Sequence, residues 1–411
     1  MTEPDVDYVL PLRWQDDSEL ADLTAYLREI SRYARVLVVD GSPADLFDSH
    51  ARAWAGLVTH LRPEPIGYLN GKVNGVRTGL QHAQAERVVI ADDDVRYDAQ
   101  SLHRTVDLLG EADLVGPQNV FVPMPWHAVW DTARTLLNRS VAADYPGTFA
   151  IRRSTFVQMG GYDGDVLFEN LELMRTVRAF GGRVVRPLGL YVPRRPADAG
   201  RFLDQRVRQA YDDLAQPWRM ATYLPVVPLL LSGWRGRRVV AAALGSSVAL
   251  AEVGRRRAGG RDVFPVTASI AAPVWVLERA VCSWVALGQR VLLGGVRYSG
   301  QRLAVAAHSP WTLRKRLRTL VTGRGPEAGD LVGPVAERLA RGPAAAAQRD
   351  GVAAGVDRAA GPVEDHEAAA DEKRSVLVRP DHGAIAAVVD LAVTHADLTA
   401  RQRRAETVSR D

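Results

Sequence analysis

The sequence predicts an α/β domain with a mainly parallel sheet, followed by membrane-associated apolar helices and a polar tail. Over residues 1–218, short apolar runs that end in polar turns alternate with helix-like stretches. Such alternation is typical of parallel strands joined by crossover helices. Apolar segments flanked by arginines occupy residues 219–303, and we expect a basic linker and a disordered tail over residues 304–411, where Ala, Gly, Arg, Asp and Glu abound.

The strands and helices of the first region follow one another along the chain. Strands are predicted at Val6–Leu12, Val36–Asp40 and Arg87–Ala91, and helices at Ser18–Tyr33 and Asn74–Ala85. Ligands of open parallel sheets bind beyond the carboxyl ends of the strands. The polar residues that follow these strands are therefore the candidates for chemistry.

Composition narrows the class of protein. The chain has 411 residues, of which 47% are hydrophobic and 24% charged, and its formal net charge is +4. Its single cysteine, Cys282, excludes an intramolecular disulfide. Basic clusters at 235–238, 255–261 and 314–318 lack the interleaved aromatic residues that stack on bases, so we expect no nucleic-acid partner. Because they flank apolar stretches, they favour an anionic membrane surface.

The apolar region holds four stretches: Met220–Gly233, Val239–Val253, Phe264–Leu277 and Ala280–Leu293. The first three are shorter than the roughly 20 residues that cross a bilayer, so tilted spans, re-entrant segments and interfacial helices all remain open. A buried, soluble helical subdomain is the alternative. Trp234, Trp275 and Trp284 near the ends of the stretches favour the membrane. We predict transmembrane or interfacial helices at the cell membrane, with the catalytic domain facing the cytoplasm.

Three consecutive carboxylates, Asp92, Asp93 and Asp94, follow the third predicted strand. Alternate residues of an extended segment point the same way, so Asp92 and Asp94 are expected to face one site. A divalent cation relieves the repulsion between two such carboxylates, and a hard oxygen site suits Mg²⁺ or Mn²⁺ bound to phosphates. A solvated acidic turn is the alternative.

Two further segments carry candidate residues for binding a nucleotide. Asp40 ends the second strand and is placed to bond a base or ribose, or merely to cap a turn. Gly71 and Lys72 precede a helix, where backbone amides and an ammonium suit a phosphate. The surrounding glycines match neither the phosphate loop of nucleotide triphosphatases nor the dinucleotide fingerprint.

Acids and polar residues later in the chain are candidates for the transfer step. Glu169 begins a helix-like stretch, where it is either a helix-end acid favoured by the dipole or a general base. Gln205 and Arg208 lie in a polar, basic segment just before the apolar region. Trp126, His127 and Trp130 are candidates for the lining of an acceptor cleft, with core packing as the alternative for at least one of them.

In this order, these motifs resemble those of the inverting family-2 glycosyltransferases, which have the nucleotide-sugar-binding GT-A fold. The resemblance covers about residues 5–215. It rests on the following segments: Pro11-Leu12-Arg13, Asp40, Gly71-Lys72, the metal motif Asp92-Asp93-Asp94, Gly160-Gly161-Tyr162-Asp163, Glu169-Asn170 and Gln205 to Gln209. The last resembles the Gln-x-x-Arg-Trp motif of membrane-bound members, including the ceramide glucosyltransferase and cellulose synthase groups.

The chain departs from the family pattern at two positions. The family's usual base is an Asp, where this chain has Asn170, which cannot accept a proton. Either Glu169 or Glu172 takes that role, or the protein is a catalytically impaired scaffold that binds nucleotide sugar. Gln209 replaces the Trp that stacks on a sugar acceptor, which argues against processive polymer synthesis.

The resemblance implies an enzyme with a nucleotide-sugar donor, by default a UDP-sugar, and Mg²⁺ or Mn²⁺ at Asp94 and Asp92. Pro11, Arg13, Asp40, Lys72 and Asp93 would contact the donor. Gln205 and Arg208 would lie near the diphosphate or acceptor, with Trp126 and His127 beside the acceptor. The apolar region adds a lipid-type acceptor as the expected partner. A sugar nucleotidyltransferase is not expected, because residues 11–15 lack the required glycine-rich loop.

Overall fold

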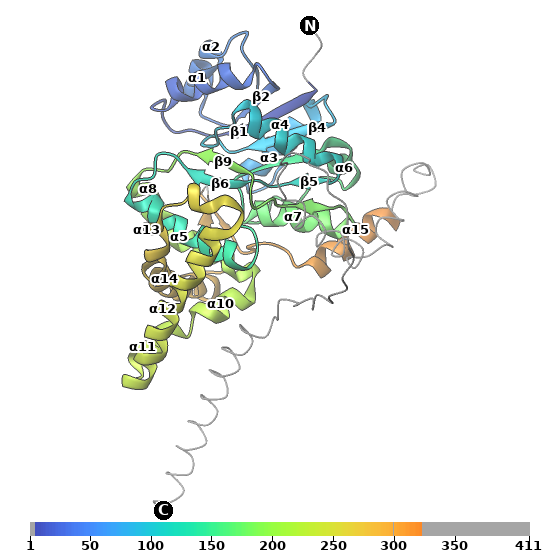
Figure 1. Cartoon of the computed structure of the whole chain (residues 1–411). Helices are drawn as coiled ribbons and strands as arrows, with labels where there is room; N and C mark the ends of the chain where they lie inside the picture. The colour runs from blue at the N-terminus through green and yellow to red at the C-terminus, as the bar shows by residue number, and fades with distance from the viewer. Residues whose placement is uncertain (1–4, 299, 323–411) are drawn as a thin grey trace, which may run out of the picture. The chain divides into compact units, whose positions relative to one another are not determined.

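The computed structural model describes residues 5–298 and 300–322, which belong to one compact unit. A seven-stranded sheet lies at its centre, in the order β3-β2-β1-β4-β7-β5-β8 (Figure 1). Its strands are β1 (Val6–Leu12), β2 (Arg35–Asp40), β3 (Thr59–Leu61), β4 (Arg87–Ala91), β5 (Leu114–Val115), β7 (Thr148–Arg152) and β8 (Val184–Val185). Strand β7 runs antiparallel to both its neighbours, and the other pairs are parallel. The predicted α/β class and mainly parallel sheet are confirmed.

Helices cover both faces of the sheet because successive strand residues point to opposite sides. Tyr8 and Leu10 of β1 pack under α1 (Leu20–Ile30) and α4 (Ala99–Asp107). Val9, between them, faces α3 (Gly71–His82) and α7 (Glu169–Ala179) on the other side. The short helices α2 (Ala44–Ala53) and α6 (Arg153–Gln158) follow β2 and β7.

The strand order reverses at β1. The chain builds outward from β1 through β2 to β3, then returns so that β4 pairs with the other side of β1. At such a switch point the connections leave in opposite directions, which opens a crevice beyond the carboxyl ends of the two strands. The acidic triplet Asp92–Asp94 directly follows β4 and so lies at this crevice.

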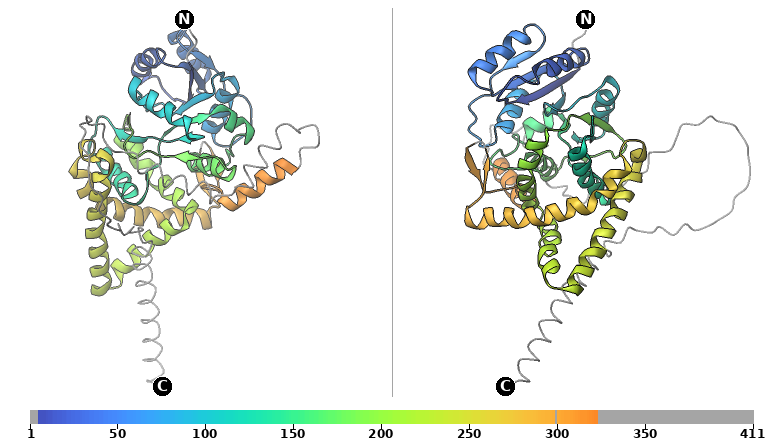
Figure 2. Two further views of the ribbon diagram at one scale, coloured as in Figure 1. Left: turned by 45° about the vertical axis from the view of Figure 1, so that its right-hand side comes forward. Right: turned by 90° about the vertical axis from the view of Figure 1, so that its left-hand side faces the viewer.

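A second layer of structure faces those strand ends. Strand β6 (Gln118–Phe121) pairs in parallel with β9 (Tyr191–Arg194) and leads into α5 (Trp126–Val141). The helices α8 (Ala199–Asp204) and α9 (Arg206–Tyr211) and the 3-10 turn η2 (Asp212–Ala215) follow β9. The two views of Figure 2 show α5 and the later helices gathered on the side of the sheet away from the N-terminus.

The apolar region folds into helices that pack against α5. They are α10 (Pro217–Tyr223), α11 (Val226–Leu231), α12 (Trp234–Arg256), η3 (Arg257–Asp262), α13 (Val266–Ile270) and α14 (Ala272–Leu292). Gly254 of α12 lies so close to α5 that a Cβ there would be only 1.9 Å from the Leu136 carbonyl oxygen. Trp275, expected at a membrane interface, is instead fully buried and edge-on to Tyr223. That expectation was wrong because its ring fills the core between the helices.

Within the part of the chain that the structure describes, no helix combines the length and apolarity needed to cross a bilayer. The prediction of a transmembrane helix is therefore not supported for residues 5–298 and 300–322.

The segment after the apolar region is ordered at its start. A hairpin of β10 (Val296–Tyr298) and β11 (Gln301–Leu303) leads to α15 (Pro310–Thr322). Leu313 and Leu317, one helical turn apart, are buried in the same core as α7. The expected basic linker thus begins as a packed helix, and the expected disordered tail, residues 323–411, lies outside the described residues.

Candidate active site

A cavity of about 430 Å³ lies where the strand ends of the sheet meet β9, α5, α8 and α9. Its volume is within the range of about 300–1,000 Å³ usual for small-molecule sites. The predicted residues that line it are Lys72, Asp92, Asp93, Asp94, His127, Glu169, Gln205 and Arg208. The fold therefore brings together residues from both halves of the predicted motif series.

The three aspartates after β4 have different partners. Asp92 Oδ1 lies 2.5 Å from Lys72 Nζ, and Asp94 Oδ2 accepts a hydrogen bond of 2.7 Å from Arg194 Nε. Asp93 accepts a 2.6 Å hydrogen bond from the indole of Trp14, in the loop after β1. Asp92 and Asp94 thus meet at the same guanidinium, that of Arg194, although they lie in a turn after β4 rather than in the extended segment on which the prediction rested. Asp93 ties the β4 loop to the β1 loop.

Asp94 is the carboxylate best suited to a cation. Its Oδ1 is buried and has no hydrogen-bond partner. Burial raises the pKa of Asp94 to about 6, and the neighbouring Asp92 and Asp93 add to this against the opposing effect of Arg194. An orphaned oxygen beside two further carboxylates fits a hard divalent ion such as Mg²⁺ or Mn²⁺. Asp92 and Asp94 are the residues that would hold it.

Lys72 links this acidic triplet to Glu169. The ammonium lies 2.8 Å from Glu169 Oε1 as well as 2.5 Å from Asp92. Asn70 caps the start of α3 by accepting a bond from the Lys72 backbone N–H, which fixes where the side chain begins. Burial opposes the charge of Lys72, but Asp92 and Glu169 raise its pKa well above the usual value. Lys72 is therefore a permanent cation between two carboxylates.

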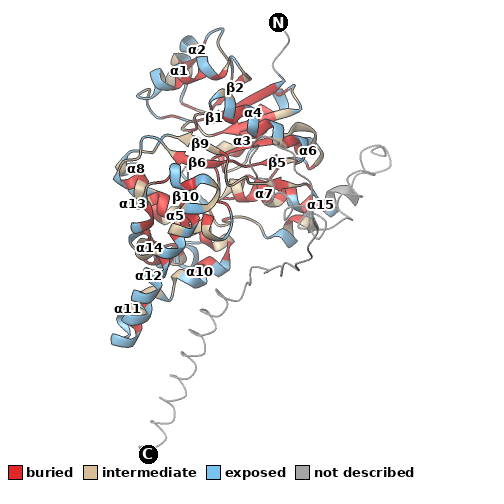
Figure 3. Cartoon of the chain, in the orientation of Figure 1, coloured by how far each residue is buried: buried red, intermediate tan, exposed pale blue. Residues whose placement is uncertain are grey.

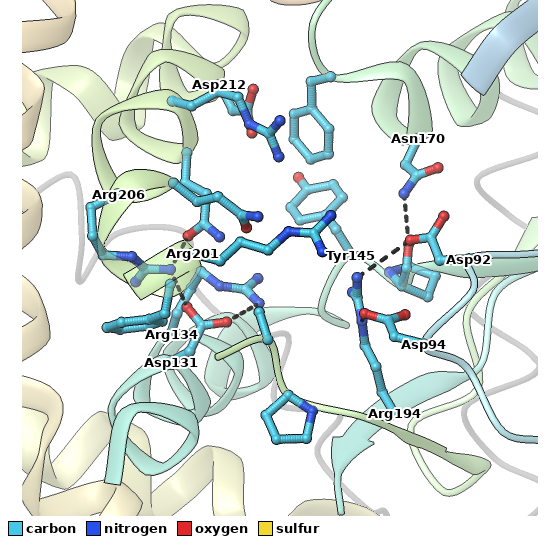
Figure 4. A pocket seen from close by; sticks show the side chains of 18 of the residues that line it. Asp92, Asp94, Asp131, Arg134, Tyr145, Asn170, Arg194, Arg201, Arg206 and Asp212 are labelled. Atoms are coloured by element: carbon cyan, nitrogen blue, oxygen red, sulfur yellow. Dashed lines mark hydrogen bonds and ion pairs between the residues drawn. The ribbon is translucent and has the colours of Figure 1, made fainter. Parts of the chain in front are cut away.

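Arg194 was not anticipated from the sequence. It ends β9, and its guanidinium reaches both Asp94 and Asp92, the latter at 3.4 Å (Figure 4). Burial opposes the charge of Arg194, but these two aspartates raise its pKa. Backbone hydrogen bonds hold β9 against the segment after β4: Arg195 N–H donates to the Asp94 carbonyl oxygen, and Val95 forms a bridge with Arg194. No local pattern in the sequence signals this long-range contact.

Asp212 is a second residue that the sequence analysis missed. It lines the cavity from η2, and its Oδ1 is buried with no hydrogen-bond partner. Burial raises its pKa to about 8, with Arg208 opposing the shift and Glu169 adding to it. A carboxyl group that titrates near neutral pH in a cleft is a candidate acid or base.

The arginines of α5, α8 and α9 that line the cavity fall into two groups: those that pair with a carboxylate and those that do not. Arg206 and Arg134 both bind the buried carboxylate of Asp131, at 3.0 and 3.3 Å (Figure 4). Arg201 and Arg208 also line the cavity, and within the described residues no carboxylate lies at ion-pair distance from either. Arg206 holds α9 to α5 through Asp131, while Arg134 pairs with Asp131 within α5. Arg201 and Arg208 have no such carboxylate partner among the described residues and are available to an anion.

Several predicted residues lie outside the cavity. Asp40 is completely buried, and its oxygens accept bonds from the backbone of Ser42 and from His50 and His60. Although burial opposes ionisation, those bonds hold the pKa of Asp40 below its usual range. Asp40 presents no exposed atom, so its predicted contact with a base is not supported by its placement.

Glu172, the alternative base, also points away from the cavity. It is fully buried, and its carboxylate accepts bonds from the backbone and ring of His308. Of the two glutamates, the placement therefore favours Glu169 as the base.

Three other predicted residues also lie outside the cavity lining. Pro11 packs against α3, and Arg13 is exposed. Trp126 is 57% exposed, and its ring meets that of His127 edge-on.

Gly147 leaves room for the side chains of Asp92 and Arg194 because it has no side chain of its own. A Cβ there would lie 2.8 Å from Asp92 Oδ2 and 2.9 Å from Arg194. We expect Gly147→Ala to weaken Mn²⁺ binding about 10- to 100-fold, as loss of an outer-shell contact does. Calorimetry of Mn²⁺ with a nucleoside diphosphate would measure it. Gly110→Ala is the control, because no atom lies within 4 Å of its Cβ; equal effects of the two changes would contradict the prediction.

No family model matches the chain, and no curated protein matches it either. Solved structures similar to it include the mannosyltransferase PcManGT from Pyrobaculum calidifontis in complex with GDP-Man and Mn²⁺. That match has a TM-score of 0.40 and 18% identity, and it covers 85% of this chain and 88% of the other. Two more have a TM-score of 0.35 and 16% identity: GalNAc-T7 with UDP, GalNAc and Mn²⁺ (47% and 44% covered), and a mycobacterial protein (49% and 70% covered).

Proposed function

We propose that this chain is a glycosyltransferase that moves a sugar from a nucleotide-sugar donor to a hydroxyl acceptor with inversion at the anomeric carbon. The observation that carries the proposal is the single cavity in which Asp92, Asp94, Lys72 and Glu169 converge at the switch point of a parallel sheet. A metal-binding pair, a phosphate-neutralising cation and a candidate base are the groups that this reaction requires.

The donor's diphosphate is the anion that the cavity suits. Lys72 lies on one side of the cavity, and the unpaired Arg201 and Arg208 lie on the other. A divalent ion held by Asp92 and Asp94 would supply charge stabilisation to the departing nucleoside diphosphate. A UDP-sugar is the donor class proposed first.

Glu169 is placed to act as the base. It lines the cavity at the start of α7, and its Oε1 lies 2.8 Å from the Lys72 ammonium. It would accept the proton of the acceptor hydroxyl while that oxygen bonds to the anomeric carbon. The bond from that carbon to the phosphate oxygen breaks in the same step, and the electron pair leaves with the nucleoside diphosphate.

The alternative is a protein that binds nucleotide sugar without transferring it. Asn170 supports this, because it replaces the family's base and its amide donates a structural hydrogen bond to the Pro146 carbonyl oxygen. Calorimetry with a panel of nucleoside diphosphates, with and without Mn²⁺, tests both proposals at the donor site. Release of nucleoside diphosphate from the matching sugar conjugate then separates them, since only a transferase breaks the glycosyl bond. Absence of any nucleotide binding by folded protein would refute both.

The acceptor that we propose is a hydroxyl group of a membrane lipid or a polyprenyl-linked molecule. The turn between α11 and α12 exposes Leu231 (79%) and Trp234 (73%), with Arg235 and Arg238 beside them. No residue of α11 is buried, and Pro228 and Leu231 are exposed (Figure 3). Apolar side chains surrounded by arginines suit the interface of an anionic bilayer.

Vesicle binding tests this part of the proposal. We expect the protein to float with anionic lipid vesicles, and the double change Leu231→Ser and Trp234→Ser to weaken binding about tenfold or more, because each side chain contributes about 1.5–3 kcal/mol when buried. Val157→Ser on α6 is the control, since Val157 is 56% exposed and lies outside the three basic clusters. Equal binding by all three proteins would contradict an interfacial role for the α11–α12 turn.

A further inference from the structure

Three potential metal ligands meet outside the cavity already described. Asp40, His50 and His60 each offer one ligand atom, and these atoms all lie within 4.8 Å of one another. None of the three lines the cavity that holds Asp94. We propose that Asp40, His50 and His60 bind a second divalent ion, of the class of Zn²⁺, at a site separate from the acidic triplet.

The fold fixes the three ligands on rigid elements. Asp40 is the last residue of β2, and His60 lies on the neighbouring parallel strand β3, paired in register with Val38. His50 is on α2, the helix that connects these two strands. All three ligands thus come from one strand–helix–strand unit, so the site does not depend on distant parts of the chain.

The distances suit a tetrahedral ion. Asp40 Oδ2 lies 2.6 Å from His50 Nδ1 and 3.1 Å from His60 Nε2. Zinc bonds of about 2.0–2.1 Å would place tetrahedral ligands about 3.3 Å apart. To reach that spacing, the Asp40 and His50 ligand atoms need to separate by about 0.7 Å, and those of Asp40 and His60 by about 0.2 Å. Two imidazoles and one carboxylate also leave a fourth position for water, as in zinc sites with three protein ligands.

Asp17 supplies the outer partner that a metal-bound histidine needs. Its Oδ1 lies 2.9 Å from His50 Nε2, the ring nitrogen that faces away from Asp40. In metal sites the second nitrogen of a ligating histidine usually donates to a carboxylate, which fixes the tautomer and orients the ring. Here Nε2–H would donate to Asp17, leaving the Nδ1 lone pair for the ion.

Burial makes a compensating charge beside Asp40 favourable. The side chains of His50 and Asp40 are fully buried, and an uncompensated charge buried there would be costly. A divalent cation would supply positive charge beside this carboxylate.

An aromatic shell surrounds the ligands. Trp54 stacks on His50 with ring centroids 4.8 Å apart, Phe47 stacks on His60 at 4.2 Å, and Trp14 meets His50 edge-on at 5.4 Å. Such a shell limits water access, which strengthens the interaction of an ion with its ligands. Trp14 also donates to Asp93, so an ion at this site would help hold the loop that carries the acidic triplet.

Cobalt titration of the full chain, expressed without a histidine tag and stripped with EDTA, tests the proposal. We expect one Co²⁺ to bind with the visible absorption of a tetrahedral site, and Zn²⁺ to displace it. His60→Gln should weaken binding at least about 100-fold, and Asp17→Asn about 10- to 100-fold, as loss of an outer-shell partner does. His103→Gln, an exposed histidine packed only on Tyr33, should bind as the unaltered protein does.

The controls separate this site from the proposed catalytic one. Asp94→Asn should leave the Co²⁺ absorption unchanged. Loss of metal binding at one of the two sites therefore does not count against the proposal for the other. Circular dichroism checks folding, and if His60→Gln does not fold, Asp17→Asn carries the comparison, because its side chain is one-third exposed. Identical titrations of the unaltered protein and the folded variants, or no tetrahedral Co²⁺ absorption at all, would overturn the proposal and leave the cluster as a hydrogen-bond network.

Discussion

Asp94→Asn is expected to abolish metal-dependent donor binding and to lower kcat/KM for transfer by about 10³-fold or more. The change keeps the shape of the side chain but removes the charge on the buried Oδ1, which has no partner in the protein. Loss of a single preorganised group that stabilises transition-state charge costs about 10²–10³-fold. Loss of the ion removes more, because the departing diphosphate then loses its main counter-charge. Calorimetry with and without Mn²⁺, and the initial rate of nucleoside diphosphate release, measure the two effects.

Asp93→Asn is the matched control for that change. Asp93 carries the same charge one residue away, but its carboxylate accepts the Trp14 indole N–H rather than facing Asp92 and Asp94. A lost hydrogen bond of this kind costs about 1 kcal/mol, so we expect less than about a tenfold loss of activity. Equal losses in both variants would mean that the triplet acts only through its total negative charge. Undiminished turnover in Asp94→Asn would refute the metal site.

The sequence predicted those parts of the site that follow from local patterns. Apolar runs ending in polar turns located β1, β2 and β4, and β4 was predicted with the same bounds that the structure has. The sequence also placed Asp92 and Asp94 together, but on the geometry of an extended strand; in the structure the strand ends at Ala91 and the two carboxylates meet across a turn. Parallel strands then place all such ends at one edge of the sheet, which explains why Lys72 and Asp92 meet although 20 residues apart.

Other residues were beyond prediction because long-range packing decides their partners. Glu169 and Glu172 both lie in the first turn of α7. Only the hydrogen bond between His308 and Glu172 shows that the carboxylate of Glu172 is already engaged. Arg194 reaches the acidic triplet because backbone hydrogen bonds hold β9 against the segment after β4. The place of Asp40 at a strand end predicted a contact with the nucleotide's base, but His50 and His60 enclose its carboxylate.

The apolar helices illustrate a further limit of periodicity. Residues buried on α12 include Gly236, Ser247, Ala251 and Gly254. The lack of a side chain lets Gly254 approach Leu136 of α5, and lets Gly236 approach Leu229 of α11. A stripe of small and apolar residues suits packing against protein and against other helices in a bilayer equally well. Hydropathy alone therefore could not separate the two, and the partner helix had to be seen.

Two carboxylates compete for the role of base, and their replacement should give opposite results. Glu169→Gln is expected to lower kcat about 10²–10⁴-fold, the usual contribution of a positioned base. Its effect on the donor Kd should stay within about tenfold, because Lys72 keeps its contact with Asp92. Asp212→Asn should retain most activity near pH 7, where a carboxyl group with a pKa of about 8 is mainly protonated and cannot accept a proton.

The pH dependence decides between them. If Asp212 were the base, kcat of the unaltered protein would rise through pH 8 as that carboxyl ionises, and Asp212→Asn would remove both the rise and the activity. If Glu169 is the base, kcat of the unaltered protein and kcat of Asp212→Asn should depend on pH in the same way around pH 8. Stability supplies an independent check: since burial raises the pKa of Asp212 in the folded state, the free energy of unfolding should fall as pH rises from about 4 toward 8. Asp212→Asn should flatten that fall, whichever residue takes the proton.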